Sequence, residues 1–217
     1  MWAYESVFYQ IYPLGFCGAP FENDGVLTPR IRKVIDWIPH IKNLGANAIY
    51  FSPVFESDTH GYNTRDFRKI DVRLGTNNDF ADVCKALHKE GIKVVLDGVF
   101  NHVGIHFAPF MDFMEKCEKS AYRDWFYPKQ YPVRIDPACY ECVGDYPYMP
   151  RLNGANGEVR NYVQKVLLYW LEHAHIDGWR FDVADELDHH AVTIWREAVK
   201  QAYPDALMLA ETWGDAS

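Results

Sequence analysis

The feature that most constrains the fold is a regular alternation of short apolar runs with longer stretches of helical periodicity. Five runs have the length and composition of buried strands: residues 7–12, 48–51, 93–97, 178–182 and 206–211. Apolar residues recur at helical spacing in residues 31–44, 76–91, 159–171 and 189–203. Strands that alternate with amphipathic helices pair in parallel through right-handed crossovers. The sequence therefore predicts the α/β class.

Local signals predict where two of these helices end. Thr76 with Asp79 three residues later is typical of a capping box, and Gly91 is expected to end the same helix. Gly45 takes the position of a C-terminal cap after the first helix. Pro39 is expected to interrupt that first helix, because proline lacks a backbone N–H and clashes with the preceding turn.

The alternation is lost between the third and fourth predicted strands, where prolines and aromatic residues dominate. A connection of this length is more often functional than a simple link. We therefore divide the chain into residues 1–101, residues 158–217 and an inserted segment, residues 102–157. The aromatic side chains of the inserted segment either pack a small core of their own or contact a ligand, and both interpretations stay open.

Composition argues against several classes of function. A net charge of −8 without clustered Lys and Arg argues against nucleic-acid binding. No apolar run approaches the roughly 20 residues of a membrane-spanning helix. Residues 1–5 lack the basic and apolar regions of a signal peptide, so we expect a cytoplasmic protein. The five cysteines are scattered, and Cys139 with Cys142 supplies only half of a zinc motif.

Carboxylates stand at the ends of three different predicted strands, as Asp97, Asp182 and Glu211. No Gly-x-Gly-x-x-Gly follows the first strand, so a closed barrel is favoured over a dinucleotide-binding sheet. In a parallel barrel such residues collect at one mouth. Arg180 and Asp182 would project to the same side of an extended strand, and Trp179 with Val183 to the other. Two carboxylates at one mouth suit glycoside cleavage.

The segments around these carboxylates resemble the α-amylase family of glycoside hydrolases. The matching segments are Asp97-Gly98-Val99-Phe100-Asn101-His102, Met149-Pro150-Arg151-Leu152-Asn153, Gly178-Trp179-Arg180-Phe181-Asp182 and Glu211-Thr212-Trp213-Gly214. His60-Gly61-Tyr62-Asn63-Thr64 looks like the family's loop after its second strand. The Met-Pro-x-Leu-Asn segment and Val183-Ala184-Asp185-Glu186 look most like the neopullulanase and cyclomaltodextrinase branch. The resemblance covers nearly the whole chain.

The resemblance implies a (β/α)8 barrel of the TIM type, with the inserted segment as the family's small protruding domain. By the same resemblance Asp182 is the nucleophile and Glu211 the general acid and base of a retaining mechanism. Arg180 is implied to hold Asp182 ionised, since a neighbouring positive charge lowers the pKa of a carboxyl group.

The resemblance also implies a substrate site. Tyr62 would stack on the sugar next to the cleaved bond, because an aromatic ring covers the apolar face of a pyranose. His102 would contact the same sugar, whereas Asp97 matches an aspartate that is mainly structural. Asn101 matches a position that carries calcium in some family members, so calcium is possible although no cofactor is required. The expected partner is an α-glucan or a maltooligosaccharide.

The chain departs from the family in its length. A barrel of this type needs eight strand–helix units and about 250 residues, whereas these 217 residues hold five predicted strands. The family's histidine–aspartate pair on the seventh strand has no counterpart in them. We therefore expect a barrel truncated after about five strands, whose edges self-associate and which has little activity alone. A glucanotransferase, an isomerase and a non-catalytic glucan-binding relative remain alternatives, although the presence of Asp182 and Glu211 favours an enzyme.

Overall fold

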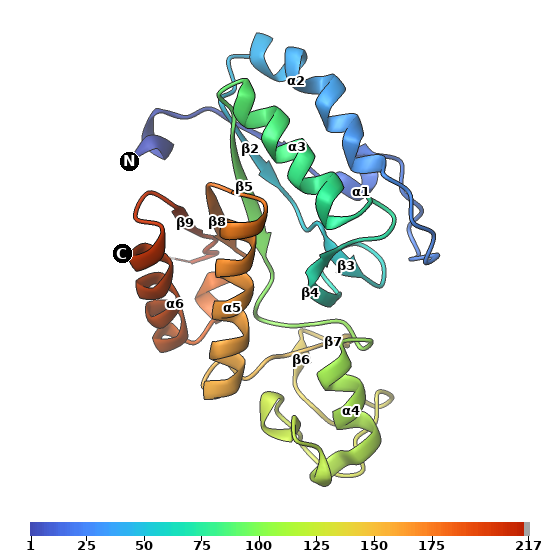
Figure 1. Cartoon of the computed structure of the whole chain (residues 1–217). Coiled ribbons are helices and arrows are strands. Elements are labelled where there is room, and N and C mark those ends of the chain that lie inside the picture. The colour runs from blue at the N-terminus through green and yellow to red at the C-terminus, as the bar shows by residue number, and fades with distance from the viewer. Residues whose placement is uncertain (215–217) are drawn as a thin grey trace.

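A five-stranded parallel sheet forms the centre of the molecule, described for residues 1–214 by a computed structural model (Figure 1). Its strands are β1 (Phe8–Ile11), β2 (Ala48–Phe51), β5 (Lys93–Gly98), β8 (Gly178–Phe181) and β9 (Leu207–Ala210). They lie in the order β1-β2-β5-β8-β9, and each neighbouring pair is parallel. A strand order that follows the chain order is typical of a barrel wall, whereas a doubly wound sheet reverses its order.

Helices connect these strands and pack against one face of the sheet. The main connections are α2 (Lys33–Asn43), α3 (Asn77–Lys89), α5 (Gly157–His173) and α6 (His189–Ala202). The shorter elements are α1 (Pro13–Phe16) and the 3-10 turns Trp2–Glu5, Arg30–Arg32, Cys117–Lys119, Arg123–Trp125 and Ala184–Glu186. Among residues 1–214 no helix combines the length and the apolar character needed to cross a membrane.

The two faces of the sheet differ in burial because successive strand side chains point to opposite sides. Leu96, Trp179 and Phe181 belong to the hydrophobic core between the sheet and the helices. On the other face, Phe8 of β1 and Leu209 of β9 are 38% and 48% exposed. Those two strands also lie at the outer edges of the described sheet. The face that would line a barrel is therefore open.

The helix ends largely follow the sequence signals. Thr76 Oγ1 accepts a hydrogen bond from the Asp79 backbone N–H, and the Asp79 carboxylate accepts one from the Thr76 backbone N–H. Gly45 and Gly91, each with φ of +76°, follow the ends of α2 and α3. Glycine suits these left-handed positions because it has no Cβ. The capping box and both helix ends are confirmed.

Pro39 does not interrupt the first helix, so that prediction was wrong. Helix α2 continues through it to Asn43. Ile38 and Ile41 lie on either side of the proline, and both are buried against the core. Tertiary packing on both sides therefore offsets the one backbone hydrogen bond that proline removes.

Two structured regions have no counterpart in the predicted alternation. A hairpin of β3 (Phe55–Ser57) and β4 (Thr64–Ile70) follows β2. The inserted segment contains α4 (Ala108–Lys116) and a hairpin of β6 (Cys142–Val143) and β7 (Tyr146–Pro150). Figure 1 shows α4, β6 and β7 grouped beyond one end of the sheet. The inserted segment is thus more regular than expected, while its limits at residues 102 and 157 remain a prediction.

A buried ion pair joins the β3–β4 hairpin to the loop after α1. Arg73 is fully buried, and its guanidinium donates to both Asp71 oxygens at 2.8 and 2.7 Å. The same guanidinium donates to Ser57 Oγ at 3.0 Å and to the carbonyl oxygens of Pro20 and Phe21 at 3.0 and 2.6 Å. Such a set of partners satisfies a charge that would otherwise be costly to bury.

Candidate active site

Three acids meet around one arginine at the carboxyl ends of neighbouring strands. Asp97 lies in β5, Asp182 directly follows β8, and Glu211 directly follows β9. Arg180 of β8 contacts all three. Its Nη1 atom is 2.8 Å from an oxygen of Asp97 and 2.8 Å from an oxygen of Asp182, and its Nη2 atom is 2.6 Å from Glu211 Oε2. The parallel pairing of β5, β8 and β9 brings these strand ends together.

Two tyrosines extend this cluster. The Tyr50 hydroxyl donates to Asp97 Oδ2 at 2.5 Å, and the Tyr62 hydroxyl lies 3.5 Å from the same oxygen. The Arg180 guanidinium lies over the Tyr50 ring, 5.7 Å from its centroid. Sequence reasoning did not identify Tyr50. The available signal was a polar side chain in the otherwise apolar second strand, on the face where a barrel has its interior.

The chain turns sharply directly after Asp182. Val183 has φ of +40°, a left-handed conformation that is unusual for a β-branched residue. Val183 therefore does not extend the strand, although the sequence predicts that it continues the extended run. The turn directs the Val183 backbone N–H to Glu211 Oε2 at 2.9 Å, and the Ala184 N–H to the Glu211 carbonyl oxygen at 2.8 Å. The strained turn after β8 thus holds Glu211, which follows the neighbouring strand β9.

The charge balance of the cluster raises the pKa of Asp182. Burial disfavours the ionised carboxylate, and the nearby charge of Asp97 adds to this effect. Arg180 acts in the opposite direction without reversing the result, and the pKa of Asp182 is about 7. Arg180 favours the ionised form of Asp182, as the resemblance implies, but burial and Asp97 outweigh it. One guanidinium shared among three carboxylates cannot neutralise all of them.

His102 lies in the loop after β5, beside Tyr62. Its side chain is buried, and neither ring nitrogen has a hydrogen-bond partner within residues 1–214. Burial lowers its pKa to about 4, so the ring is neutral near pH 7. A neutral imidazole offers one donor and one acceptor.

The surroundings of Asn101 do not suit calcium. Its amide oxygen faces Arg151 Nη2 at 3.5 Å, and its amide nitrogen donates to Glu186 Oε2 at 3.3 Å. Calcium takes six to eight oxygen ligands, and a guanidinium beside Asn101 Oδ1 would repel the ion. Within the described part of the chain, no group of three or more His, Cys, Asp and Glu side chains is arranged to hold a metal ion.

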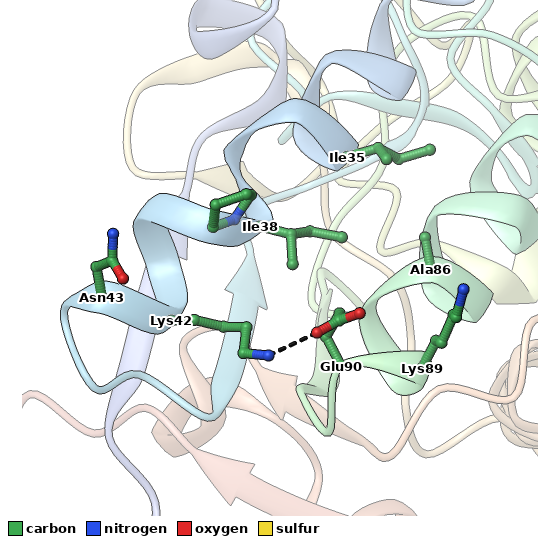
Figure 2. A pocket seen from close by; sticks show the side chains of 8 residues that line it. Ile35, Ile38, Lys42, Asn43, Ala86, Lys89 and Glu90 are labelled. Atoms are coloured by element: carbon green, nitrogen blue, oxygen red, sulfur yellow. Dashed lines mark hydrogen bonds and ion pairs between the residues drawn. The ribbon is translucent and has the colours of Figure 1, made fainter.

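Cavities occur both at the acid cluster and away from it. One of about 480 Å³ lies on the open face of the sheet, against Tyr50, Arg180 and Glu211. A larger one, of about 550 Å³, lies between α2 and α3. Figure 2 shows that second cavity, with Lys42 paired to Glu90 at 2.5 Å. It has no cluster of acids to support chemistry, so we place the candidate active site at the acid cluster, of which Arg180 and Glu211 also line the smaller cavity.

Comparison with known proteins agrees with this geometry. The family model described as "Alpha amylase, catalytic domain" matches residues 10–217. The chain belongs to the alpha-amylase family. A cyclomaltodextrinase from a Bacillus species is 38% identical over all of this chain and 42% of its own length. Neopullulanase 2 from Thermoactinomyces vulgaris is 40% identical over all of this chain and 40% of its own length.

A solved structure supports the barrel architecture of this alpha-amylase family chain. The ligand-free cyclic alpha-maltosyl-(1→6)-maltose hydrolase from Arthrobacter globiformis is 35% identical and superposes with a TM-score of 0.88. The match covers 98% of this chain and 52% of that protein. The prediction of a TIM-barrel type fold of the alpha-amylase family is confirmed. The chain spans about two fifths of the length of the curated relatives it matches.

Proposed function

We propose that the protein is a glycoside hydrolase that cleaves α-glucans with retention of anomeric configuration. The observation that carries this proposal is the pair Asp182 and Glu211, which follow neighbouring strands and contact one guanidinium. Retaining glycosidases place their two carboxyl groups about 5 to 5.5 Å apart. Neighbouring strands lie about 4.8 Å apart, so strand ends of this kind can supply that separation.

Each residue then has a chemical task. Asp182 attacks the anomeric carbon to form a covalent glycosyl intermediate, while Glu211 protonates the leaving oxygen. Glu211 next takes a proton from the water that releases the sugar. The Val183 N–H and Arg180 orient Glu211 for both steps. Tyr62 and His102 bind the sugar next to the cleaved bond, and Asp97 positions Arg180.

The names of the relatives support maltodextrins, cyclic maltodextrins or pullulan as substrates. A glucanotransferase or isomerase would use the same two carboxylates, since the reactions differ in what attacks the intermediate. The test is to incubate the intact protein with cyclomaltodextrin or maltohexaose and follow the new reducing ends by NMR. We expect the α-anomer to appear first. Initial release of the β-anomer, or no cleavage of any α-glucan, would overturn the proposal.

The raised pKa of Asp182 predicts the pH dependence. The nucleophile must be ionised, so kcat/KM on maltodextrin should fall as pH decreases through about 7, the pKa of Asp182. Because the charge of Asp97 contributes to that value, Asp97→Asn should move the midpoint to lower pH in the activity that remains. A wild-type midpoint near the ordinary aspartate value of 3.8, or one that Asp97→Asn leaves unchanged, would contradict this assignment.

Two further expectations remain proposals. The 217-residue chain should self-associate through the edges of β1 and β9. The side chains of Phe8 in β1 and Leu209 in β9 are accessible to such a partner. Unpaired strand edges offer hydrogen-bonding groups to any second strand, including another copy of the same edge. A cytoplasmic location is the other proposal.

A further inference from the structure

A row of four rings leads from the acid cluster to the surface of the inserted segment. Tyr62, whose hydroxyl lies 3.5 Å from Asp97 Oδ2, is the inner end of this aromatic row. Its ring centroid lies 6.1 Å from that of His60, which lies 6.1 Å from that of Tyr148. Tyr146 follows at 5.7 Å and is 54% exposed. The row therefore continues from the candidate site to solvent.

The outer half of the aromatic row is separate from the hydrophobic core of the inserted segment. Tyr140 and Phe110 belong to that core, with ring centroids 5.0 Å apart. Tyr146 and Tyr148 do not belong to it. They occupy alternate positions of β7, and the carbonyl oxygen of the intervening Pro147 accepts a hydrogen bond from Tyr140 at 2.6 Å. Strand β7 is thus anchored to the core while it presents these two tyrosines elsewhere.

The sequence left open whether the aromatic residues of the inserted segment pack a core or contact a ligand, and this arrangement assigns them to two groups. Most aromatic rings of the inserted segment fill its core, whereas Tyr146 and Tyr148 extend a row that begins at the acids. Aromatic faces cover the apolar C–H faces of sugar rings, and tyrosine adds a hydroxyl at the wet end. The rings of His60 and Tyr148 meet at 66° and those of Tyr148 and Tyr146 at 60°, so the row offers ring faces that point in different directions to a chain of sugars.

We propose that Tyr148 and Tyr146 form a binding platform for glucose units of an α-glucan that lie beyond the sugar contacted by Tyr62. The platform rests on the proposed function, since it needs a glucan chain in the active site. It gives the inserted segment a direct role in the preference for longer substrates. Maltose, which is short enough to bind beside Tyr62 and His60, should not depend on the platform.

The test compares ligands of two lengths in the intact protein. Tyr146→Ala/Tyr148→Ala is made in a Glu211→Gln background, so that turnover does not consume the ligand, and calorimetry measures Kd for maltose and maltohexaose. We expect about tenfold weaker binding of maltohexaose and less than about twofold change for maltose, where tenfold corresponds to about 1.4 kcal/mol. Tyr146→Trp/Tyr148→Trp should retain tight binding of maltohexaose, because the aromatic faces are kept.

Tyr131→Ala is the matched control. Tyr131 is an exposed tyrosine of the same segment, but its ring packs against Phe113 of α4, 6.5 Å away, and not against the aromatic row. We expect that control to bind maltohexaose as the parent does. Equal weakening of both ligands in Tyr146→Ala/Tyr148→Ala would overturn the platform, as would unchanged binding of both. If the Glu211→Gln parent binds no α-glucan and the protein with Glu211 intact cleaves none, the proposed function fails and the platform fails with it.

Discussion

Asp182→Asn will lower kcat of the intact protein on maltodextrin by about 10⁴-fold or more, because an amide cannot form the glycosyl intermediate. Glu211→Gln will cause a comparable loss of kcat/KM on maltodextrin and a much smaller loss of kcat/KM on α-maltosyl fluoride, because kcat/KM reports the step that forms the intermediate. Fluoride leaves without a proton, so the first step no longer needs an acid. The two variants therefore separate the nucleophile from the acid, which share contacts with Arg180 in the resting site.

Steady-state kinetics on the two substrates provide the measurement. Asp205→Asn is the matched control, since Asp205 is an exposed aspartate that precedes β9, at the end of the sheet away from the acids. It should stay within about twofold of the parent, as expected for a surface substitution. Near-normal hydrolysis of maltodextrin by Asp182→Asn would refute its role as nucleophile. Equal losses of kcat/KM on both substrates for Glu211→Gln would refute the role of Glu211 as acid.

Arg73→Met will lower the free energy of unfolding by about 3–5 kcal/mol, the usual effect of removing one partner of a buried ion pair. The substitution leaves Asp71 buried without its counter-charge and removes the contacts to Pro20 and Phe21. Urea unfolding followed by circular dichroism measures this loss. Replacing both partners, as in Asp71→Leu/Arg73→Met, should cost less than Arg73→Met alone, because no lone charge then remains.

A surface arginine supplies the comparison for Arg73. Arg32 pairs with Asp79 and Asp82 at 2.6 Å each, yet its side chain is 47% exposed. Exposed pairs contribute about 0–1 kcal/mol, so Arg32→Met should change the free energy of unfolding by no more than that. Similar losses for Arg32→Met and Arg73→Met would show that burial does not govern the contribution of these pairs.

Hydrophobic periodicity predicted a strand or helix correctly where burial of one face determined the order of apolar and polar residues. The five sheet strands are apolar on at least the face that packs against helices, so their runs stand out. Strand β4 was missed because Arg65, Asp66, Arg68 and Lys69 interrupt its apolar residues, and its burial does not follow a period of two. Helix α4 was missed because the whole inserted segment was taken as irregular on account of its prolines and aromatic residues, although a proline such as Pro109 suits the first turn of a helix.

In the candidate site, the positions of the acids could be predicted from the local sequence, whereas properties that depend on distant residues could not. Asp97, Asp182 and Glu211 could be found because each ends a strand, and strand ends are encoded locally. The pKa of Asp182 could not, because it depends on burial and on the distance to Asp97, 85 positions earlier in the chain. Tyr50 was missed for a related reason. Its hydrogen bond to Asp97 depends on how β2 and β5 pair.

The surplus of negative charge around Arg180 has a consequence for the reaction path. Three acids face one guanidinium, and burial together with the charge of Asp97 raises the pKa of Asp182 to about 7, so its protonated and ionised forms are closely balanced near that pH. A sugar in the transition state brings its own positive charge, because the anomeric carbon becomes oxocarbenium-like. That charge can take the place of the proton. The empty site carries an excess of negative charge, and the positive charge that develops on the sugar offsets it as the glycosidic bond breaks. The site therefore binds the transition state more tightly than the substrate.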